Sequence, residues 1–254
     1  VKGIPLENDG PQMEFLEVQL AGGDRPVFFY LIPDFQNPSG TVLSPGKRDR
    51  LVDLARTYAF WIVEDVPYRM LRYRGYEAPT LLETAPDRVI QMSSYSKLIS
   101  PGLRVGHMIV PEQLADPLTR IAEETYINAS YLNQAIVYDF VRRGWLEPQI
   151  ETLKATYRPR LDATLAALET HMSDLATWHR PDGGFFVGAT LNAPVDAGVL
   201  QQRAMEAGLL LTDGRSFFPD GNGDQFVRLP FCALTEEEID GGIASLARVV
   251  RSLV

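Results

Sequence analysis

The sequence predicts an α/β fold with a mostly parallel sheet, followed by a smaller α+β unit. Three consecutive patterns predict the sheet: Val27–Ile32 is an unbroken apolar run, residues 44–58 have helical periodicity, and Phe60–Val63 is a second apolar run. Continuous apolar runs are typical of strands that are buried on both faces of a parallel sheet. A strand, a helix and a second strand in this order predict a βαβ unit.

Composition narrows the classes of partner. The 254 residues carry 24 basic and 33 acidic side chains, a net charge of −9, which argues against nucleic acid or an anionic membrane as the main partner. No apolar run is long enough to span a membrane. The single cysteine, Cys232, excludes an intrachain disulfide, and the three histidines lack metal-ligand spacing, so we expect no metal site and a reducing, cytoplasmic compartment.

The first strand is expected to end in a turn that can bind a ligand. The segment Pro33–Gly40 contains proline, asparagine and glycine, which are typical turn residues. In open α/β sheets, ligands bind at the carboxyl ends of the strands. Ser44 and Pro45 follow as the expected N-cap and first residue of a helix that extends to about Tyr58.

The second strand runs directly into two carboxylates, Glu64 and Asp65. A carboxylate at the end of a buried strand is costly unless it has a partner. Two interpretations of Asp65 remain open at this point. It either caps the amino terminus of a helix or pairs with a protonated ring nitrogen of a ligand.

Residues 91–106 form the central feature of the chain, because they set Lys97 and Arg104 among hydroxyls and glycines. The flanking apolar runs 89–92 and 105–110 are expected to be buried strands. A cationic, hydroxyl-rich loop between strands indicates a phosphate site. The chemistry that fits it is pyridoxal 5'-phosphate (PLP) held as a Schiff base on Lys97, with Ser94, Ser96 and Arg104 on the phosphate. The alternative is a solvated surface lysine.

Three helices are predicted after this loop, at about residues 112–128, 131–143 and 147–172. The third is long enough to leave one domain and enter another. We therefore expect a boundary near Trp145, with residues 1–145 in a large domain and residues 146–254 in a small carboxyl-terminal domain.

The remaining segments predict the smaller α+β unit. Arg228 is unusual there, because a cation inside an apolar strand requires an anion, either a structural carboxylate or a substrate carboxylate. Thr235 and Glu238 have the spacing of a capping box at the start of a terminal helix. The other expected elements are strands at Gly183–Gly188, Leu209–Leu211 and Phe226–Phe231 and a helix at Asp196–Ala207.

Taken together, these patterns resemble the class I/II aminotransferases, PLP enzymes of fold type I. The likeness is nearest to the branch that holds the 2-aminoadipate and kynurenine aminotransferases, and it covers essentially the whole chain. Four segments carry it in the family's order: Phe35–Gly40, Val63–Tyr68, Ser94–Arg104 and Phe226–Leu229.

The resemblance implies a role for each matching residue. Lys97 forms the Schiff base and moves the substrate proton, so it is catalytic together with Asp65 and Tyr68. The implied cofactor contacts are Asn37 and Tyr68 on the phenolic oxygen, Asp65 on the pyridine nitrogen, and Ser94, Ser96 and Arg104 on the phosphate, while Arg228 and Asn37 bind the substrate carboxylate.

The resemblance also implies an activity and an assembly. The expected reaction moves an amino group from an amino acid to a 2-oxo acid, in a homodimer whose active sites lie at the subunit interface. Family members are considerably longer, and the additional part would precede Val1, so we expect this chain to be a fragment that lacks part of the phosphate cradle. The alternatives are the aminotransferase-like effector domain of a GntR-type transcription regulator, a PLP-dependent β-lyase, and a cofactor-free scaffold.

Overall fold

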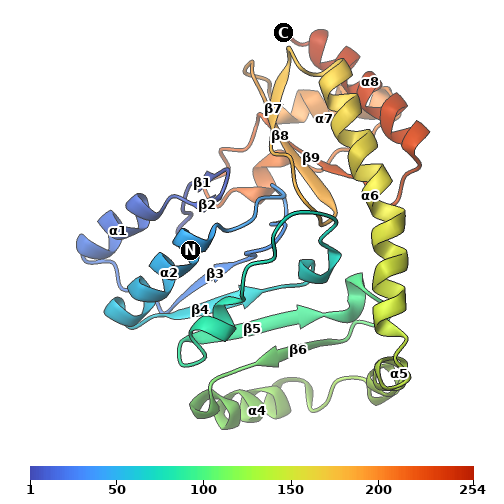
Figure 1. The fold of residues 1–254 in the computed structure, drawn as a ribbon. Helices are drawn as coiled ribbons and strands as arrows, with labels where there is room; N and C mark the ends of the chain where they lie inside the picture. The colour runs from blue at the N-terminus through green and yellow to red at the C-terminus, as the bar shows by residue number, and fades with distance from the viewer.

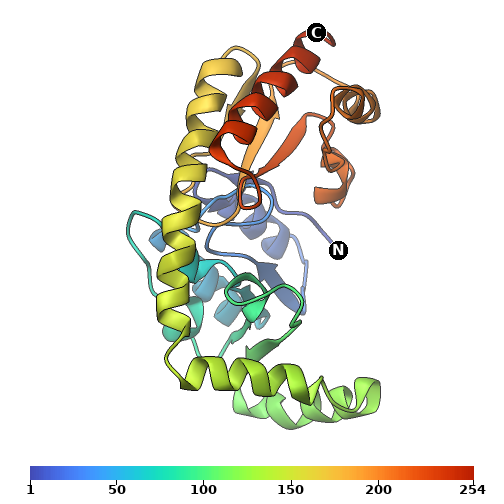
Figure 2. The same cartoon turned by 90° about the vertical axis from the view of Figure 1, so that its right-hand side faces the viewer.

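The computed structural model describes residues 1–254 and has two sheets joined by a long helix, α6 (Leu146–His171). Figures 1 and 2 show α6 running along one side of the molecule from the first sheet to the second. The first sheet has the order β3-β4-β5-β6, the second has the order β7-β8-β9, and a small hairpin, β1-β2, lies near the amino terminus. The strands of the first sheet are β3 (Phe28–Leu31), β4 (Trp61–Asp65), β5 (Val89–Ser94) and β6 (Gly106–Ile109), and the hairpin is β1 (Leu6–Glu7) and β2 (Gly10–Pro11).

The first sheet confirms the predicted mostly parallel arrangement. β3, β4 and β5 are parallel neighbours, whereas β6 pairs with β5 in the antiparallel direction. α2 (Pro45–Tyr58) connects β3 to β4 and begins at the predicted proline, directly after Ser44. The connection from β4 to β5 contains the short 3₁₀ helix η1 (Arg69–Leu71) and α3 (Leu81–Thr84).

The expectation of strands buried on both faces is wrong for β3 and β6. Phe28 and Tyr30 are 57% and 50% exposed, and all four residues of β6 are exposed. The physical reason is that both are edge strands, and that α1 (Met13–Ala21), α2 and α3 form the layer that packs on one face of the sheet. In β4, Ile62 and Glu64 face this layer and are fully buried, while the alternate residues are only partly covered.

The predicted helices after the central loop are confirmed as α4 (Glu112–Tyr126), α5 (Tyr131–Arg142) and α6. α4 has a strongly apolar side but no buried residue, and its Ile121 and Tyr126 are 58% and 61% exposed. No helix of the structure is long and apolar enough to cross a membrane.

The second sheet is antiparallel throughout and consists of β7 (Ala176–Trp178), β8 (Phe186–Leu191) and β9 (Phe226–Pro230). The predicted capping box at Thr235 and Glu238 starts α8 (Glu236–Arg251), which packs along α6. The remaining elements are α7 (Ala197–Glu206), capped by Asp196, and the 3₁₀ helix η3 (Gly214–Phe217).

Two predicted strands of this part need correction. Leu209–Leu211 is not a strand, because its backbone pairs with no neighbouring strand: Leu209 donates to the carbonyl of Ala204 in α7, and Leu211 accepts from the Gln201 side chain. The strand expected at Gly183–Gly188 begins only at Phe186. Gly183 and Gly184 instead form a close turn in which a β-carbon on Gly183 would lie 2.3 Å from the carbonyl oxygen of Leu71.

The larger apolar core connects the two parts of the molecule. Its 28 buried residues include Leu161, Phe185 and Val227 from the second part and Phe35, Tyr68, Leu71, Tyr73 and Leu98 from loops of the first. These loops follow β3, β4 and β5, and their packing against the second part fixes their position. A separate core of 14 residues lies between α1, α2 and the first sheet.

Candidate active site

The structure gathers the predicted site residues at one edge of the first sheet. Asn37 lies in the turn after β3, Asp65 ends β4, Ser94 ends β5, and Lys97 ends the 3₁₀ helix η2 (Tyr95–Lys97) that follows. These three strands are parallel, so their carboxyl ends meet at the same edge. Arg228 approaches this edge from β9 of the second part.

Arg228 is held by four groups, none of which is a carboxylate. Its Nη1 donates to Asn37 Oδ1 at 3.0 Å and its Nη2 to Thr212 Oγ1 at 3.2 Å. The guanidinium lies over two aromatic rings, with centroids at 4.7 Å for Phe186 and 4.8 Å for Phe217. Its buried Nε has no partner.

Arg228 therefore lacks the structural carboxylate that was one of its two expected partners, since no ion pair involves it. Burial lowers the pKa of its guanidinium, but an arginine in a protein keeps its charge. The remaining expectation is a carboxylate supplied by a ligand.

Asn37 and Tyr68 each present an unused polar group. Because Asn37 Oδ1 accepts from Arg228, the amide nitrogen of Asn37 is left as a free donor. Tyr68 is only 4% exposed, and its ring packs edge-on against Phe185 and Phe186. Burial, reinforced by the nearby Asp65, raises the pKa of the Tyr68 phenol to about 12, so the hydroxyl stays protonated and can donate.

The two neighbouring carboxylates of β4 have different tasks. Glu64 is fully buried and accepts from the backbone amides of Leu81 and Leu82 at the start of α3, at 2.8 and 3.2 Å. Asp65 points to the opposite face and caps no helix; its single hydrogen bond comes from Tyr30 Oη at 2.8 Å. The helix-capping interpretation thus fits Glu64, and Asp65 remains available for a ligand.

The electrostatics of Asp65 reflect this isolation. Burial raises the pKa of its carboxyl group, and the hydrogen bond from Tyr30 opposes that rise. No lysine or arginine pairs with Asp65 within 4.0 Å. Its charge is consequently balanced by no cation of the chain.

The loop after β5 carries the predicted phosphate residues. Ser94 Oγ accepts from the backbone amide of Ser96 at 3.1 Å, and Arg104 Nη1 lies 3.5 Å from Ser96 Oγ. Arg104 is exposed and has the left-handed backbone angle φ of 52°, which is uncommon for a residue other than glycine. Neither Arg104 nor Lys97 pairs with a carboxylate, so the loop holds two cations whose charge is not neutralised, beside two serine hydroxyls.

The structure adds site residues that the sequence did not indicate. Cys232 lies close enough to interact electrostatically with Lys97 and Arg228, and burial raises the pKa of its thiol. The others are Tyr30, which donates a hydrogen bond to Asp65, and Thr212, Phe186 and Phe217, which hold Arg228. No local sequence pattern marks these residues, because each reaches the site through the tertiary fold or the strand register.

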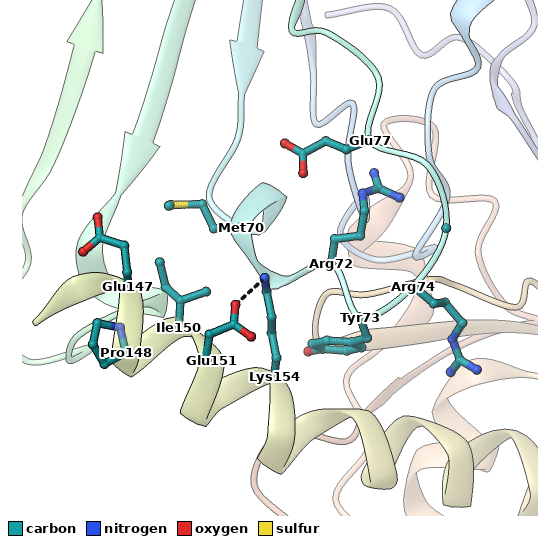
Figure 3. A pocket seen from close by; sticks show the side chains of 11 residues that line it. Met70, Arg72, Tyr73, Arg74, Glu77, Glu147, Pro148, Ile150, Glu151 and Lys154 are labelled. Carbon is teal, nitrogen blue, oxygen red and sulfur yellow. Dashed lines mark hydrogen bonds and ion pairs between the residues drawn. The ribbon is translucent and has the colours of Figure 1, made fainter.

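A cavity of about 700 Å³ lies elsewhere, between α6 and the segment that follows η1. Its lining includes Arg72, Arg74, Glu77 and Lys154 but none of the predicted site residues. Figure 3 shows Lys154 directed to Glu151 of the same helix, at 2.9 Å. Its lining mixes acidic and basic side chains, so the cavity presents no group of like charges that would bind one kind of ligand. The structure also contains no cluster of three or more histidine, cysteine or acidic side chains that could hold a metal ion.

Comparisons with known proteins agree on one family. A family model described as "Aspartate amino-transferase" matches residues 1–252. The aromatic-amino-acid aminotransferase 1 of Thermococcus litoralis is 34% identical over 98% of this chain and 61% of its own length. An uncharacterized HTH-type transcriptional regulator of Bacillus subtilis, YdfD, is 29% identical over 99% of this chain and 52% of its own length.

A solved structure is also similar. The α-aminoadipate aminotransferase LysN from Thermus thermophilus, in complex with N-(5'-phosphopyridoxyl)-L-leucine, superposes with a TM-score of 0.92 and 31% identity over 98% of this chain and 65% of that chain. The predicted fold type I architecture is thereby confirmed. This chain spans less than two thirds of the length of these relatives.

Proposed function

The chain belongs to the aspartate aminotransferase family, and from this premise we propose that its site transfers an amino group from an amino acid to a 2-oxo acid with PLP as cofactor. The phosphopyridoxyl-leucine in the Thermus relative supports both the cofactor and the class of substrate. The chain covers 61% of the length of that aromatic-amino-acid aminotransferase.

The observation that carries this proposal is the unpaired Arg228. Its guanidinium is fixed by Asn37, Thr212 and two aromatic rings, yet it has no carboxylate partner and keeps a buried Nε free. A rigid guanidinium with unused donors suits bidentate binding of a carboxylate. We assign it to the α-carboxylate of the amino acid, with Asn37 as the residue that orients it.

The other free groups fit the parts of PLP. Arg104 would offer a cation to its phosphate, and Ser94 and Ser96 would offer hydroxyl donors; the three residues are close together on one loop. Asp65, which has no cation partner, would accept a hydrogen bond from the protonated pyridine nitrogen. The donors of Asn37 and Tyr68 would bond the phenolic oxygen.

The cofactor, when bound, supplies an aldehyde that takes up amino groups and a ring that draws electrons away from the substrate Cα. The chain's own part is to hold and move protons. Lys97 Nζ, which has no hydrogen-bond or ion-pair partner, would hold the cofactor and later take the proton from the substrate Cα. Asp65 would keep the ring nitrogen protonated.

We propose the organisation of the protein on the same basis. Residues 1–145 would be part of the cofactor-binding large domain and residues 146–254 the small domain, with α6 passing from one to the other. The exposed apolar side chains of α4 and α5 support a homodimer, because such surfaces are usually covered by a partner. A single cysteine is consistent with a cytoplasmic location.

An assay of the products tests the activity. The chain is supplied with PLP, with aromatic amino acids or 2-aminoadipate, and with a 2-oxo acid such as 2-oxoglutarate. We expect one new amino acid and one new 2-oxo acid in equal amounts, and none of either with Lys97→Ala. Release of ammonia without consumption of the 2-oxo acid would instead indicate a β-lyase.

A second candidate is a ligand-sensing effector domain of a transcription regulator. The similarity to the Bacillus subtilis regulator over 99% of this chain favours it. Such a domain binds PLP or an amino acid without turnover. PLP bound to Lys97 together with no transfer of an amino group would support this candidate over the enzyme.

A further inference from the structure

Tyr30 contacts Asp65 from the neighbouring strand. In the parallel register of β3 and β4, Tyr30 lies opposite Val63, two residues before Asp65. Side chains alternate along a strand, so Tyr30, Val63 and Asp65 share the face of the sheet that no helix covers. The register thus brings the phenol of Tyr30 to Asp65 Oδ2 at 2.8 Å.

The hydrogen bond uses only one side of the carboxylate. Asp65 Oδ2 accepts from Tyr30, while Oδ1 has no partner in the chain. A carboxyl group with one oxygen held is limited in its rotation about χ2, and the other oxygen keeps its lone pairs for a ligand. Tyr30 therefore sets which oxygen of Asp65 is available.

The donor is neutral, and this matters for the charge of the site. The titratable groups that face Asp65 are Tyr30 from β3 and Tyr68 from the segment after β4, whereas β5 contributes Met92 as the register partner. An arginine or lysine at Tyr30's place would neutralise the carboxylate and compete with a positively charged ligand nitrogen. A phenol stabilises the ionised carboxylate and leaves its negative charge in place.

Tyr30 also keeps its proton over the whole working range of pH. Burial, and then the hydrogen bond to Asp65, raises the pKa of the phenol far above its usual value. The phenol therefore always donates and the carboxylate always accepts in this pair. Tyr30 is nevertheless half exposed. This exposure means that the contact is not needed to fill the core.

We propose that Tyr30 is a positioning residue for Asp65: its hydroxyl orients the carboxylate and keeps it ionised, so that Oδ1 can accept from the protonated ring nitrogen of the cofactor. The part of this proposal that concerns the cofactor rests on the proposed function. The hydrogen bond itself belongs to the chain alone.

The first test needs no cofactor and no turnover. The chain is labelled with ¹³C at the aspartate carboxyl carbons, and the Asp65 signal, identified by its loss in Asp65→Asn, is titrated by NMR. We expect Tyr30→Phe to raise the pKa of Asp65, because the bond that stabilises the carboxylate is lost. Tyr76→Phe is the matched control, since Tyr76 is 72% exposed and makes no side-chain hydrogen bond. An unchanged titration in Tyr30→Phe overturns the proposal.

The second test concerns the cofactor. PLP binding is measured by fluorescence quenching for the wild type, Tyr30→Phe and Tyr76→Phe, after circular dichroism has shown that all three are folded. We expect PLP to bind about tenfold more weakly to Tyr30→Phe only, as for loss of one hydrogen bond to a charged group. Equal affinities would refute the role toward the cofactor. A wild type that binds no PLP would contradict the proposed function, whereas the titration still decides the Tyr30–Asp65 pair.

Discussion

Asp34 lies three residues before Asn37 and accepts hydrogen bonds from three arginines. It is fully buried, and its Oδ1 accepts from Arg48 at 3.2 Å and Arg72 at 2.9 Å, while its Oδ2 accepts from Arg69 at 3.0 Å. The three guanidinium groups come from α2 and from the segment around η1. Asp34 therefore ties the Asn37 turn to the segment that follows Tyr68.

Replacing Asp34 with asparagine removes the charge and keeps the shape. Whichever way the amide is turned, its nitrogen is a donor that faces at least one arginine donor. The side chains of Arg48, Arg69 and Arg72 are only 5%, 14% and 8% exposed, so water cannot replace the lost partner. Arg48 and Arg69 keep a second carboxylate, Glu64 and Glu77, but Arg72 pairs with Asp34 alone. Leaving a buried charge without its partner costs about 3–5 kcal/mol. For a chain of this size that is a fall in melting temperature of about 6–20 °C.

Urea and thermal unfolding of the cofactor-free chain measure the effect. Asp139→Asn is the matched control, because Asp139 also accepts from two arginines, at 2.9 and 2.5 Å, but in solvent. Its loss should change the unfolding midpoint little, since water screens exposed pairs. If Asp34→Asn lowers the free energy of unfolding by less than about 1 kcal/mol, the buried network does not stabilise the turn as argued.

Three further predictions concern the site and its support. Arg228→Ala should raise KM for the amino acid at least about 30-fold, because truncating a buried charged partner costs about 2 kcal/mol or more. Steady-state kinetics measure this change, and a PLP-binding assay should show unchanged retention of the cofactor. If the variant loses PLP or unfolds, Arg228 is structural. Burial raises the pKa of Asp65 above its unfolded value of 3.8. The ionised carboxylate therefore lowers the stability of the folded chain as the pH rises from 3.8 through the raised pKa, and it has no such effect at lower pH, where Asp65 is neutral in both states. Asp65→Asn should therefore unfold at a higher temperature than the wild type near pH 7, by a margin that shrinks toward pH 4, and thermal scans that show a constant margin contradict this. Gly183→Ala should lower the free energy of unfolding by about 1–3 kcal/mol in urea titrations, because its β-carbon would lie 2.3 Å from the carbonyl oxygen of Leu71, and a neutral result would mean that this turn can shift.

The sequence predicted the elements whose signals are local. Pro45 after Ser44 and the capping box at Thr235 and Glu238 each satisfy backbone groups within one turn, so the helices begin where these residues indicate. The turn residues after Ile32 likewise fixed the position of Asn37 at the end of a strand. These local rules were sufficient for the βαβ order of the first sheet.

Predictions that depend on neighbours in space were less successful. The apolar run 27–32 has the composition of a central strand, but only the assembled sheet determines that β3 is an edge. Leu209–Leu211 has strand-forming composition yet finds no strand to pair with. In the site, Asp65 and Arg228 are visible as charges within apolar strands, whereas Tyr30 and Phe217 become relevant only through register and packing.

The central claim is that Lys97 holds PLP. The direct measurement is incubation of the chain with PLP, reduction with borohydride, and mapping of the labelled peptide by mass spectrometry. The account predicts one reduced pyridoxyl group on Lys97, and none at this position in Lys97→Ala, whose other lysines provide the background. A folded chain that carries no label, or carries it on another lysine, would contradict the claim.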